Sequence, residues 1–133
     1  MAGVAHGNPG LAGAAAEILD SRGKTLERVS KYLGIATSAQ AAFQAVILGL
    51  EQARRWRPDS VRLLLENDAV RRQLTGKSRA HIPETIDLLA RAEALLADQP
   101  DVVLPVPDPK VMSVAERLAI LAVETRGRRL ALD

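Results

Sequence analysis

The sequence predicts an α/β fold in which a mixed β-sheet is flanked by helices. Apolar segments along the chain fall in the order strand, strand, helix, strand, helix, helix, strand, helix, with no internal repeat. Strands that alternate with helices in this way are typical of a sheet with βαβ units. A chain of 133 residues also fits one domain, residues 1–133, which is long enough to bury about two thirds of its unfolded surface.

The composition limits the class of protein. Hydrophobic residues make up 47% of the chain but aromatic residues only 2%, so we expect a core of alanine, leucine and valine with Phe43, Tyr32 and Trp56 as its only rings. The absence of cysteine excludes disulfides and thiolate metal sites. No apolar run reaches the roughly 18 residues of a membrane span, and the first residues lack the pattern of a secretory signal. We therefore expect a cytoplasmic protein.

A turn and a β-hairpin are expected first. Residues 6–10 (HGNPG) combine proline with glycine, which favours a turn. Residues 11–19 and 24–33 then predict two strands, and residues 20–23 fit a four-residue hairpin connection with glycine near its end. The small side chains of residues 14–16 predict that another element packs closely against the first of these strands.

The longest element is a helix predicted over residues 37–56 (TSAQAAFQAVILGLEQARRW). Its polar side chains share one narrow stripe of the helix: Gln40, Gln44, Glu51 and Arg55. The other positions are mostly apolar, which predicts a helix covered on most sides. Thr37 followed by Gln40 fits a capping box at the start, and Pro58 ends the helix because proline cannot continue it.

Two more strands and three helices are predicted after Pro58. Residues 60–65 (SVRLLL) suit a buried parallel strand, and residues 102–106 suit an edge strand because Pro105 has no N–H to donate. The helices are expected over residues 68–74, 83–98 and 113–126. Asn67 or Asp68 can cap the first of them, and Ser113 with Glu116 forms a capping box for the last.

Four motifs occur in order along the chain: GNPG at residues 7–10, TSAQAAFQAVILGLE at 37–51, LLLENDAVRRQLTG at 63–76 and AERLA at 115–119. In this order and spacing they resemble the bacterial ribonuclease H family, whose counterparts are close to DGASRGNPGPAG, TNNQAEYQALILGLE, VRGDSELVVRQLTG and ADALA. The resemblance covers almost the whole chain. It implies a ribonuclease-H-like fold whose first central strand, which precedes the position of Ala2 in the family, is missing here.

The resemblance also implies a chemistry and its loss. The family hydrolyses the RNA strand of an RNA/DNA hybrid with two magnesium ions, which four carboxylates hold. The first aspartate of the family falls on Ala2 and its glutamate on Ala42, whereas the other two carboxylates fall on Glu66 and Glu116. Glu66 and Glu116 are therefore the remnants of the catalytic site. Each also has a structural interpretation, since Glu66 precedes a helix N-terminus and Glu116 belongs to a capping box.

Five residues are candidates for contact with nucleic acid: Asn8, Thr37, Arg72, Lys77 and Arg79. The basic residues could neutralise phosphates, but a run of charge is also typical of a solvated face. Asn8 in a turn and Thr37 as a cap likewise need no ligand. Eighteen basic residues against sixteen acidic ones mean that any such binding depends on a local patch. His6 and His81 have no third ligand in view, so no metal site is expected.

Two functions remain open at this point. The first is a catalytically inactive module that needs no cofactor and binds RNA/DNA hybrid, another nucleic acid or a protein. The alternative is an active ribonuclease H that cleaves RNA in such hybrids with Mg²⁺. No membrane association is expected. A missing central strand would expose unpaired backbone groups, so a homodimer that completes the sheet is a further hypothesis.

Overall fold

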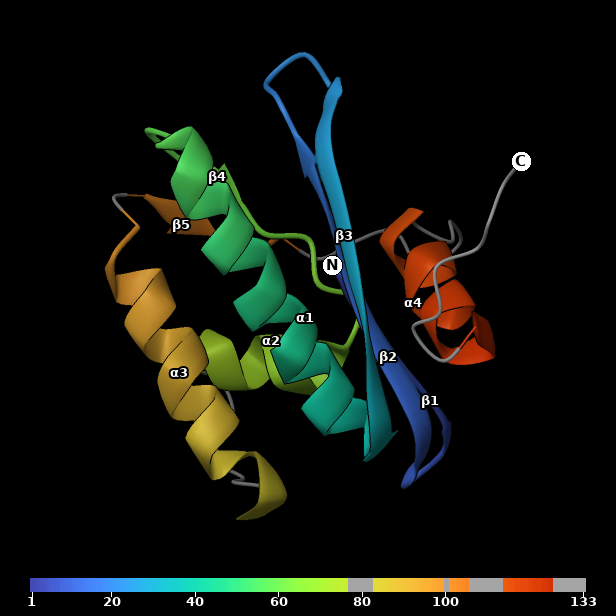
Figure 1. The fold of residues 1–133 in the computed structure, drawn as a ribbon. Helices are drawn as coiled ribbons and strands as arrows, with labels where there is room; N and C mark the ends of the chain where they lie inside the picture. The colour runs from blue at the N-terminus through green and yellow to red at the C-terminus, as the bar shows by residue number, and fades with distance from the viewer. Residues whose placement is uncertain (77–82, 100, 106–113, 126–133) are drawn as a thin grey trace, which may run out of the picture.

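The computed structural model describes residues 1–76, 83–99, 101–105 and 114–125. Three strands form an antiparallel sheet in the order β1 (Ala2–Gly7), β2 (Gly10–Leu19) and β3 (Thr25–Ala36). Figure 1 shows helix α1 (Ser38–Ala53) on one side of this sheet and helix α4 (Val114–Thr125) on the other. Helix α3 (Ile86–Ala97) packs on the outside of α1. The mixed α/β architecture expected from the sequence is confirmed.

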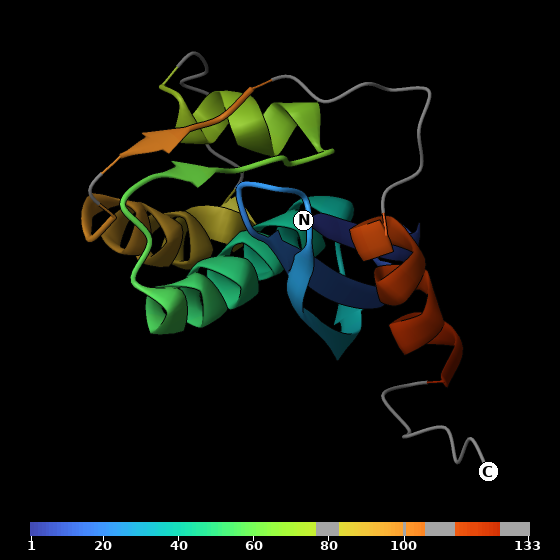
Figure 2. The same ribbon diagram turned by 90° about the horizontal axis from the view of Figure 1, so that it is seen from above.

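A second, smaller sheet lies beside the first. Strands β4 (Val61–Arg62) and β5 (Val102–Val103) run parallel, as expected for a βαβ unit, and Figure 2 shows them above α1 and α3. Strands β1 and β4 belong to different sheets. The two sheets meet where the backbone nitrogen of Met1 donates a hydrogen bond of 2.8 Å to the carbonyl of Leu64. Helix α2 (Asp68–Leu74) follows β4.

Local signals set the start of α1 as predicted. The backbone N–H of Gln40 donates to the hydroxyl of Thr37 at 3.1 Å, and the N–H of Thr37 donates to the side-chain carbonyl of Gln40 at 2.8 Å. This capping box satisfies two of the N–H groups that a helix start leaves unpaired. The α-helix ends at Ala53 and continues as the short 3₁₀ helix η1 (Arg54–Trp56). Asn67 caps α2 in the same way, through the N–H of Val70.

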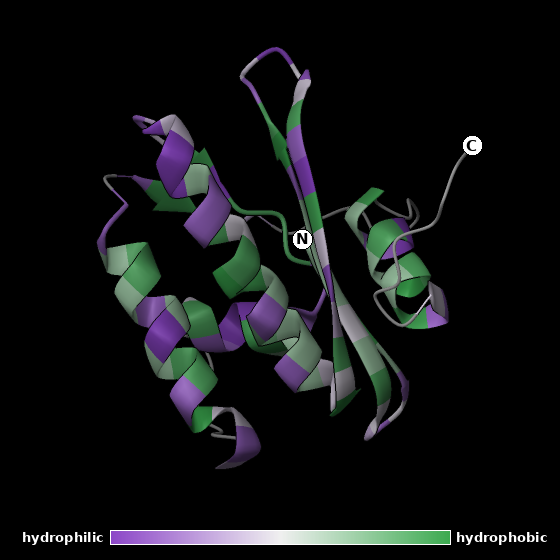
Figure 3. Cartoon of the chain, viewed as in Figure 1, coloured by the Kyte–Doolittle hydropathy of each residue, from purple (hydrophilic) through white to green (hydrophobic). Residues whose placement is uncertain are grey.

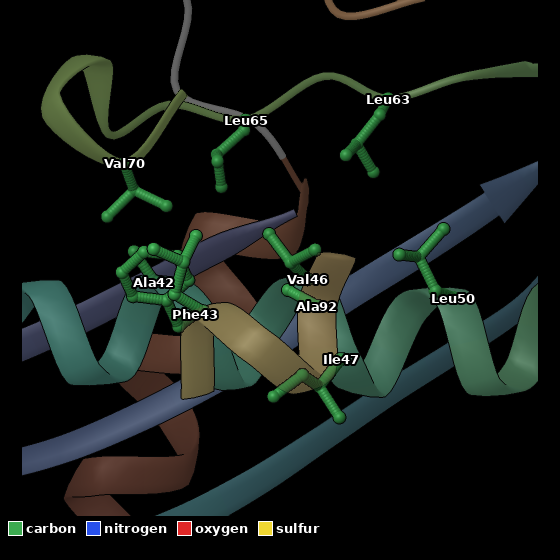
Figure 4. Packing of buried hydrophobic residues seen from close by; sticks show 10 residues of the cluster. Ala42, Phe43, Val46, Ile47, Leu50, Leu63, Leu65, Val70 and Ala92 are labelled. Carbon is green, nitrogen blue, oxygen red and sulfur yellow. The ribbon is translucent and has the colours of Figure 1, made fainter. Parts of the chain in front are cut away.

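The main core lies between α1, α3 and the segment after β4. Its fully buried side chains include Phe43 and Leu50 from α1 and Leu63 and Leu65 from the β4 segment, which face one another in Figure 4. Trp56, in contrast, keeps 49% of its surface exposed. The expectation that this ring belongs to the core is therefore wrong, because η1 carries it past the end of the packed part of α1.

Small residues bring the layers close together. A Cβ built on Gly3 of β1 would overlap the backbone of Ala41 and Ala42 in α1, and a Cβ on Gly13 of β2 would lie 2.5 Å from the carbonyl oxygen of Ala119 in α4. Residues 14–16 of β2 are completely buried between these helices, which confirms the close packing predicted from their small side chains. Both helices can approach the sheet only because these positions lack larger side chains.

The observed strands differ from the expected ones in three places. Strand β1 was not foreseen, although it pairs with β2 along its whole length from Ala2 to Gly7. Strand β3 continues to Ala36, three residues beyond the predicted end. The strands expected over residues 60–65 and 102–106 shrink to the two-residue β4 and β5. Ser113 and residues 126–127, which we expected to bound the last helix, lie outside the described residues.

Two further expectations can be compared with the described helices. None of them is long and apolar enough to cross a lipid bilayer.

The helix expected from Pro83 begins instead with the 3₁₀ turn η2 (Pro83–Thr85) and becomes α3 at Ile86. Figure 3 shows polar and apolar residues interspersed along α1 and α3. The apolar residues of the two helices pack in one core cluster, which includes Val46 of α1 and Leu89 of α3.

The close approach of β1 and α1 makes a direct prediction for Gly3. Replacing it by alanine should lower the free energy of unfolding by about 3 kcal/mol, because the added methyl group meets backbone that cannot move aside. Gly34→Ala is the control, since its Cβ meets no atom within 4 Å and only its φ of +72° is unfavourable; it should cost about 1 kcal/mol. Urea unfolding measures both. Equal costs would show that the β1–α1 approach is wrong.

Candidate functional site

The four positions to which the resemblance assigns carboxylates come together in the structure. Ala2 lies in β1 and Ala42 in α1, where the two backbones approach most closely. Glu66 directly follows the β4 segment, and its negative charge acts on the buried amino group of Met1, next to Ala2. Glu116, in the first turn of α4, shares a hydrogen bond with Glu66. Four separate elements thus meet at one place.

Half of this site is apolar. Ala2 is 2% exposed and Ala42 is completely buried. In Figure 4, Ala42 lies beside Phe43 under Leu65 and Val70, in the main core. Neither alanine can hold an ion, and no described side chain takes their place as an oxygen ligand. The apolar half of the site therefore belongs to the packing of the fold.

The other half is a pair of carboxyl groups. The pKa of Glu116 is raised, first by burial, then by the hydrogen bond with Glu66 and by the negative charge of Glu66. Ionisation of Glu116 therefore places a second negative charge beside Glu66, which favours the protonated form of Glu116.

These residues do not fit the two magnesium ions that the resemblance implies. The described residues contain no group of three or more histidine, cysteine, aspartate or glutamate side chains that could hold a metal. Asp68, the next acid along the chain, is bound by Arg71 at 2.7 Å and by Arg72 at 2.8 Å. The hydrogen bond from Arg71 is the main reason that the pKa of Asp68 is lowered. Asp68 thus belongs to α2 and its arginines.

The nucleic-acid candidates divide into two groups in the structure. Asn8 and Thr37 lie together at the start of α1, because the side-chain oxygen of Asn8 accepts a hydrogen bond of 3.0 Å from the N–H of Ser38. Arg72, on α2, has a side chain that is 60% exposed. Lys77 and Arg79 lie outside the described residues, as does His81. His6 is exposed at the end of β1 and is not part of a metal-binding group among the described residues.

Arg71 changes the interpretation of the basic stretch around α2. Its place beside Arg72 in the sequence suggests a charge available to phosphates, but it is only 7% exposed and its guanidinium donates to Asp68. This arginine therefore has a structural role. No local signal indicated that Glu66 and Glu116 touch, since fifty positions separate them; the resemblance alone placed them at one site.

The chain also matches a known family over most of its length. The sequence model of the family described as "Reverse transcriptase-like" matches residues 1–122. The chain belongs to this family. Its ribonuclease-H-like domain, expected from the four motifs, is confirmed.

Two curated relatives cover a similar part of the chain. "Bifunctional protein Rv2228c" of Mycobacterium tuberculosis is 30% identical over 94 residues, which are 70% of this chain and 26% of that protein. "Ribonuclease HI" of Halobacterium salinarum is 31% identical over 94 residues, 71% of this chain and 47% of that protein. The matched region thus spans about a quarter of one relative and less than half of the other.

Solved structures show the same architecture over nearly the whole domain. The N-terminal ribonuclease H domain of Rv2228c matches with a TM-score of 0.88 and 25% identity, over 93% of this chain and 90% of that one. Ribonuclease H1 of Halobacterium salinarum matches with a TM-score of 0.86 and 28% identity, over 92% of this chain and 93% of that one. LC11-RNase H1 from compost, in complex with an RNA/DNA hybrid, matches with a TM-score of 0.86 and 26% identity, over 94% of each chain.

The contact between the two glutamates makes a prediction about pH. Glu66→Gln removes one charge and should bring the pKa of Glu116 down toward its ordinary value, although burial, the largest cause, remains. Titration of the side-chain carbonyl carbons by NMR measures this pKa. An unchanged pKa of Glu116 in the variant would contradict the contact between the two glutamates.

The same shift determines how stability changes with pH. Glu116 holds its proton more tightly in the folded chain than in the unfolded one, where its pKa has its ordinary value. This contribution to stability is complete below that value and is lost as the pH rises through the raised pKa. Between the ordinary and the raised pKa of Glu116, Glu66→Gln should lose less stability than the parent chain. Urea unfolding at a series of pH values measures this difference.

Proposed function

We propose that this chain is a ribonuclease-H-like module that binds RNA/DNA hybrid without hydrolysing it. The observation that carries the proposal is the burial of Ala2 and Ala42 in the packed contact between β1 and α1, at two of the four positions where the resemblance calls for carboxylates. The module therefore keeps the fold of the family and lacks half of the ligands that hydrolysis needs.

Charge argues against hydrolysis. Two divalent ions about 3.5–4 Å apart repel each other strongly and need bridging and flanking oxygens of negative charge. Glu66 and Glu116 can supply at most two negative charges, and the raised pKa of Glu116 makes the second of them less favourable. Magnesium also demands near-ideal octahedral geometry, which two ligands do not enforce.

Binding draws its support from the fold and from exposed groups near the start of α1. A similar structure, that of LC11-RNase H1, contains an RNA/DNA hybrid. Asn8 and Thr37 lie together at the N-terminal end of α1, where the helix dipole favours phosphate. Arg72 adds an exposed positive charge on α2. Contacts to the phosphate backbone of this kind position a duplex without reading its sequence.

The alternative function is an active hybrid-cleaving ribonuclease. It is favoured by one observation: the structure brings Glu66 and Glu116 into contact, as an active site would require. Hydrolysis by these two groups would need further ligands, and the described residues provide none. The two functions make opposite predictions for a single assay.

The purified chain should not cleave a labelled RNA/DNA hybrid with magnesium or manganese. An active ribonuclease H assayed in parallel shows that the substrate is competent. Turnover that follows this chain through purification and stops with a chelator would establish the alternative function and refute ours.

Restoring the lost ligands should require both substitutions. Ala2→Asp with Ala42→Glu should increase the affinity for Mg²⁺, while either change alone should not, because ligands of one site act as a unit. Ala42 is completely buried, so the larger side chain must displace neighbours and will lower stability. Calorimetric titration with Mg²⁺ is therefore combined with a thermal melt of each variant. A single variant that binds Mg²⁺ as tightly as the double variant would contradict the requirement for both ligands.

Hybrid binding is tested with a substitution that keeps the fold. Asn8→Asp preserves the oxygen that accepts from the N–H of Ser38 and adds one negative charge where we place phosphate. It should weaken hybrid binding about threefold to tenfold at low salt. Ser30→Asp adds the same charge at an exposed position of β3 and should have little effect. Fluorescence anisotropy of a labelled hybrid measures both, and equal affinities would remove Asn8 from the interface.

A further inference from the structure

The far end of α1 carries a surface that the proposed function does not use. Four consecutive residues, Arg54, Arg55, Trp56 and Arg57, are exposed; we call them the α1-end surface. Trp56 is the only tryptophan of the chain and keeps 49% of its surface exposed. Half of this indole is therefore open to a ligand, and its neighbours on both sides in the sequence are arginines.

Hydrogen bonding holds Trp56 against a second element. Its indole N–H donates to a carboxylate oxygen of Glu27 in β3 at 3.3 Å. Figure 1 shows the C-terminal end of α1 and the turn between β2 and β3 at the same end of the molecule. The indole is thus tied to the β2–β3 hairpin while much of its surface remains open to a ligand.

Arg57 adopts a backbone conformation that arginine rarely takes. Its φ of 45° and ψ of 56° lie in the left-handed region, where glycine fits at no steric cost. Arg57 is the sole described residue other than glycine with positive φ. Its guanidinium and that of Arg55 make no ion pair with any described residue. Strained positions of this kind concentrate at functional sites.

The need to end a helix explains only part of this surface. Cations near the C-terminus of a helix complement its dipole, which accounts for Arg54 and Arg55. A guanidinium nitrogen of Arg54 also lies 3.9 Å from a carboxylate oxygen of Asp98. Both side chains are more than half exposed, so this ion pair contributes little to stability. Neither argument accounts for an exposed tryptophan or for arginine at a position suited to glycine.

The α1-end surface is distinct from the candidate site. Ala42 and Trp56 are fourteen positions apart along α1 and η1, a helical rise of roughly 20 Å. A ligand on one end of this helix therefore leaves the other end free.

We propose that the α1-end surface binds single-stranded nucleic acid. Trp56 offers a ring on which a base stacks, and the guanidinium groups of Arg55 and Arg57 contact the phosphates on either side. Base stacking on an aromatic ring combined with arginine is the common basis of single-strand binding without sequence preference. An acidic protein segment could use the charges but has no base to stack on the indole.

The single tryptophan makes the first test direct. An oligothymidylate should quench the tryptophan fluorescence, since Trp56 is the only tryptophan of the chain. The affinity should fall as salt rises, with a log–log slope of about −1.4 for two phosphate contacts. Polyglutamate at equal charge should leave the fluorescence unchanged. Quenching by polyglutamate but not by the oligonucleotide would replace our proposal with a protein partner.

Variants then separate stacking from charge, with a labelled oligothymidylate as the probe in fluorescence anisotropy. Trp56→Ala should weaken binding about tenfold, and Trp56→Tyr, which keeps an aromatic ring, should restore most of it. Arg55→Ala with Arg57→Ala should also weaken binding about tenfold, since two phosphate contacts are lost. The control removes two positive charges elsewhere, Lys31→Ala in β3 with Arg117→Ala in α4, both exposed.

Arg57→Gly separates function from folding. Glycine relieves the left-handed conformation, so this variant should melt at an equal or higher temperature and yet bind the single strand more weakly. The proposal would be overturned if Trp56→Ala bound the oligothymidylate as tightly as the parent chain. It would also be overturned if the control variant at Lys31 and Arg117 lost as much affinity as the variant at Arg55 and Arg57. Because the probe is single-stranded, failure here leaves hybrid binding at Asn8 untouched, and failure of hybrid binding leaves this surface untouched.

Discussion

The structure depends above all on the close approach of α1 to β1. A side chain at Gly3 would overlap the backbone of Ala41 and Ala42, so the helix lies against the strand with only hydrogen atoms between them. This contact places the capped start of α1 beside the turn that holds Asn8. It also seals the main core, in which Phe43 and Leu50 are completely buried. Efficient packing of this kind tolerates few larger side chains.

The same contact determines what the candidate site can do. Ala2 and Ala42 are buried in it, so the two positions that the family resemblance assigns to metal ligands serve packing instead. In the acidic remainder, burial and the neighbouring Glu66 raise the pKa of Glu116. The approach of α1 to β1 therefore determines both the packing of the fold and the apolar half of the candidate site.

Sequence reasoning succeeded where the signal was local. The capping box at Thr37 and the cap at Asn67 depend on neighbouring residues, and both are confirmed. It failed for β1, because residues 2–7 (AGVAHG) have little strand propensity and become a strand only by pairing with β2. Burial was equally hard to foresee: we expected Trp56 in the core, whereas half of its surface is exposed, and no sequence signal indicated that Arg71 is buried. Such outcomes depend on contacts between distant segments.

The central claim is that this ribonuclease-H-like domain has no site for paired divalent ions. Manganese is the most direct probe, because its unpaired electrons broaden the NMR signals of nuclei near a bound ion. If the claim holds, Mn²⁺ broadens the amide signals of Ala2, Ala42, Glu66 and Glu116 no more than it broadens the amide signals of exposed acidic residues elsewhere in the chain. Selective broadening of these four signals at low Mn²⁺ concentration, reversed by Mg²⁺, would contradict it.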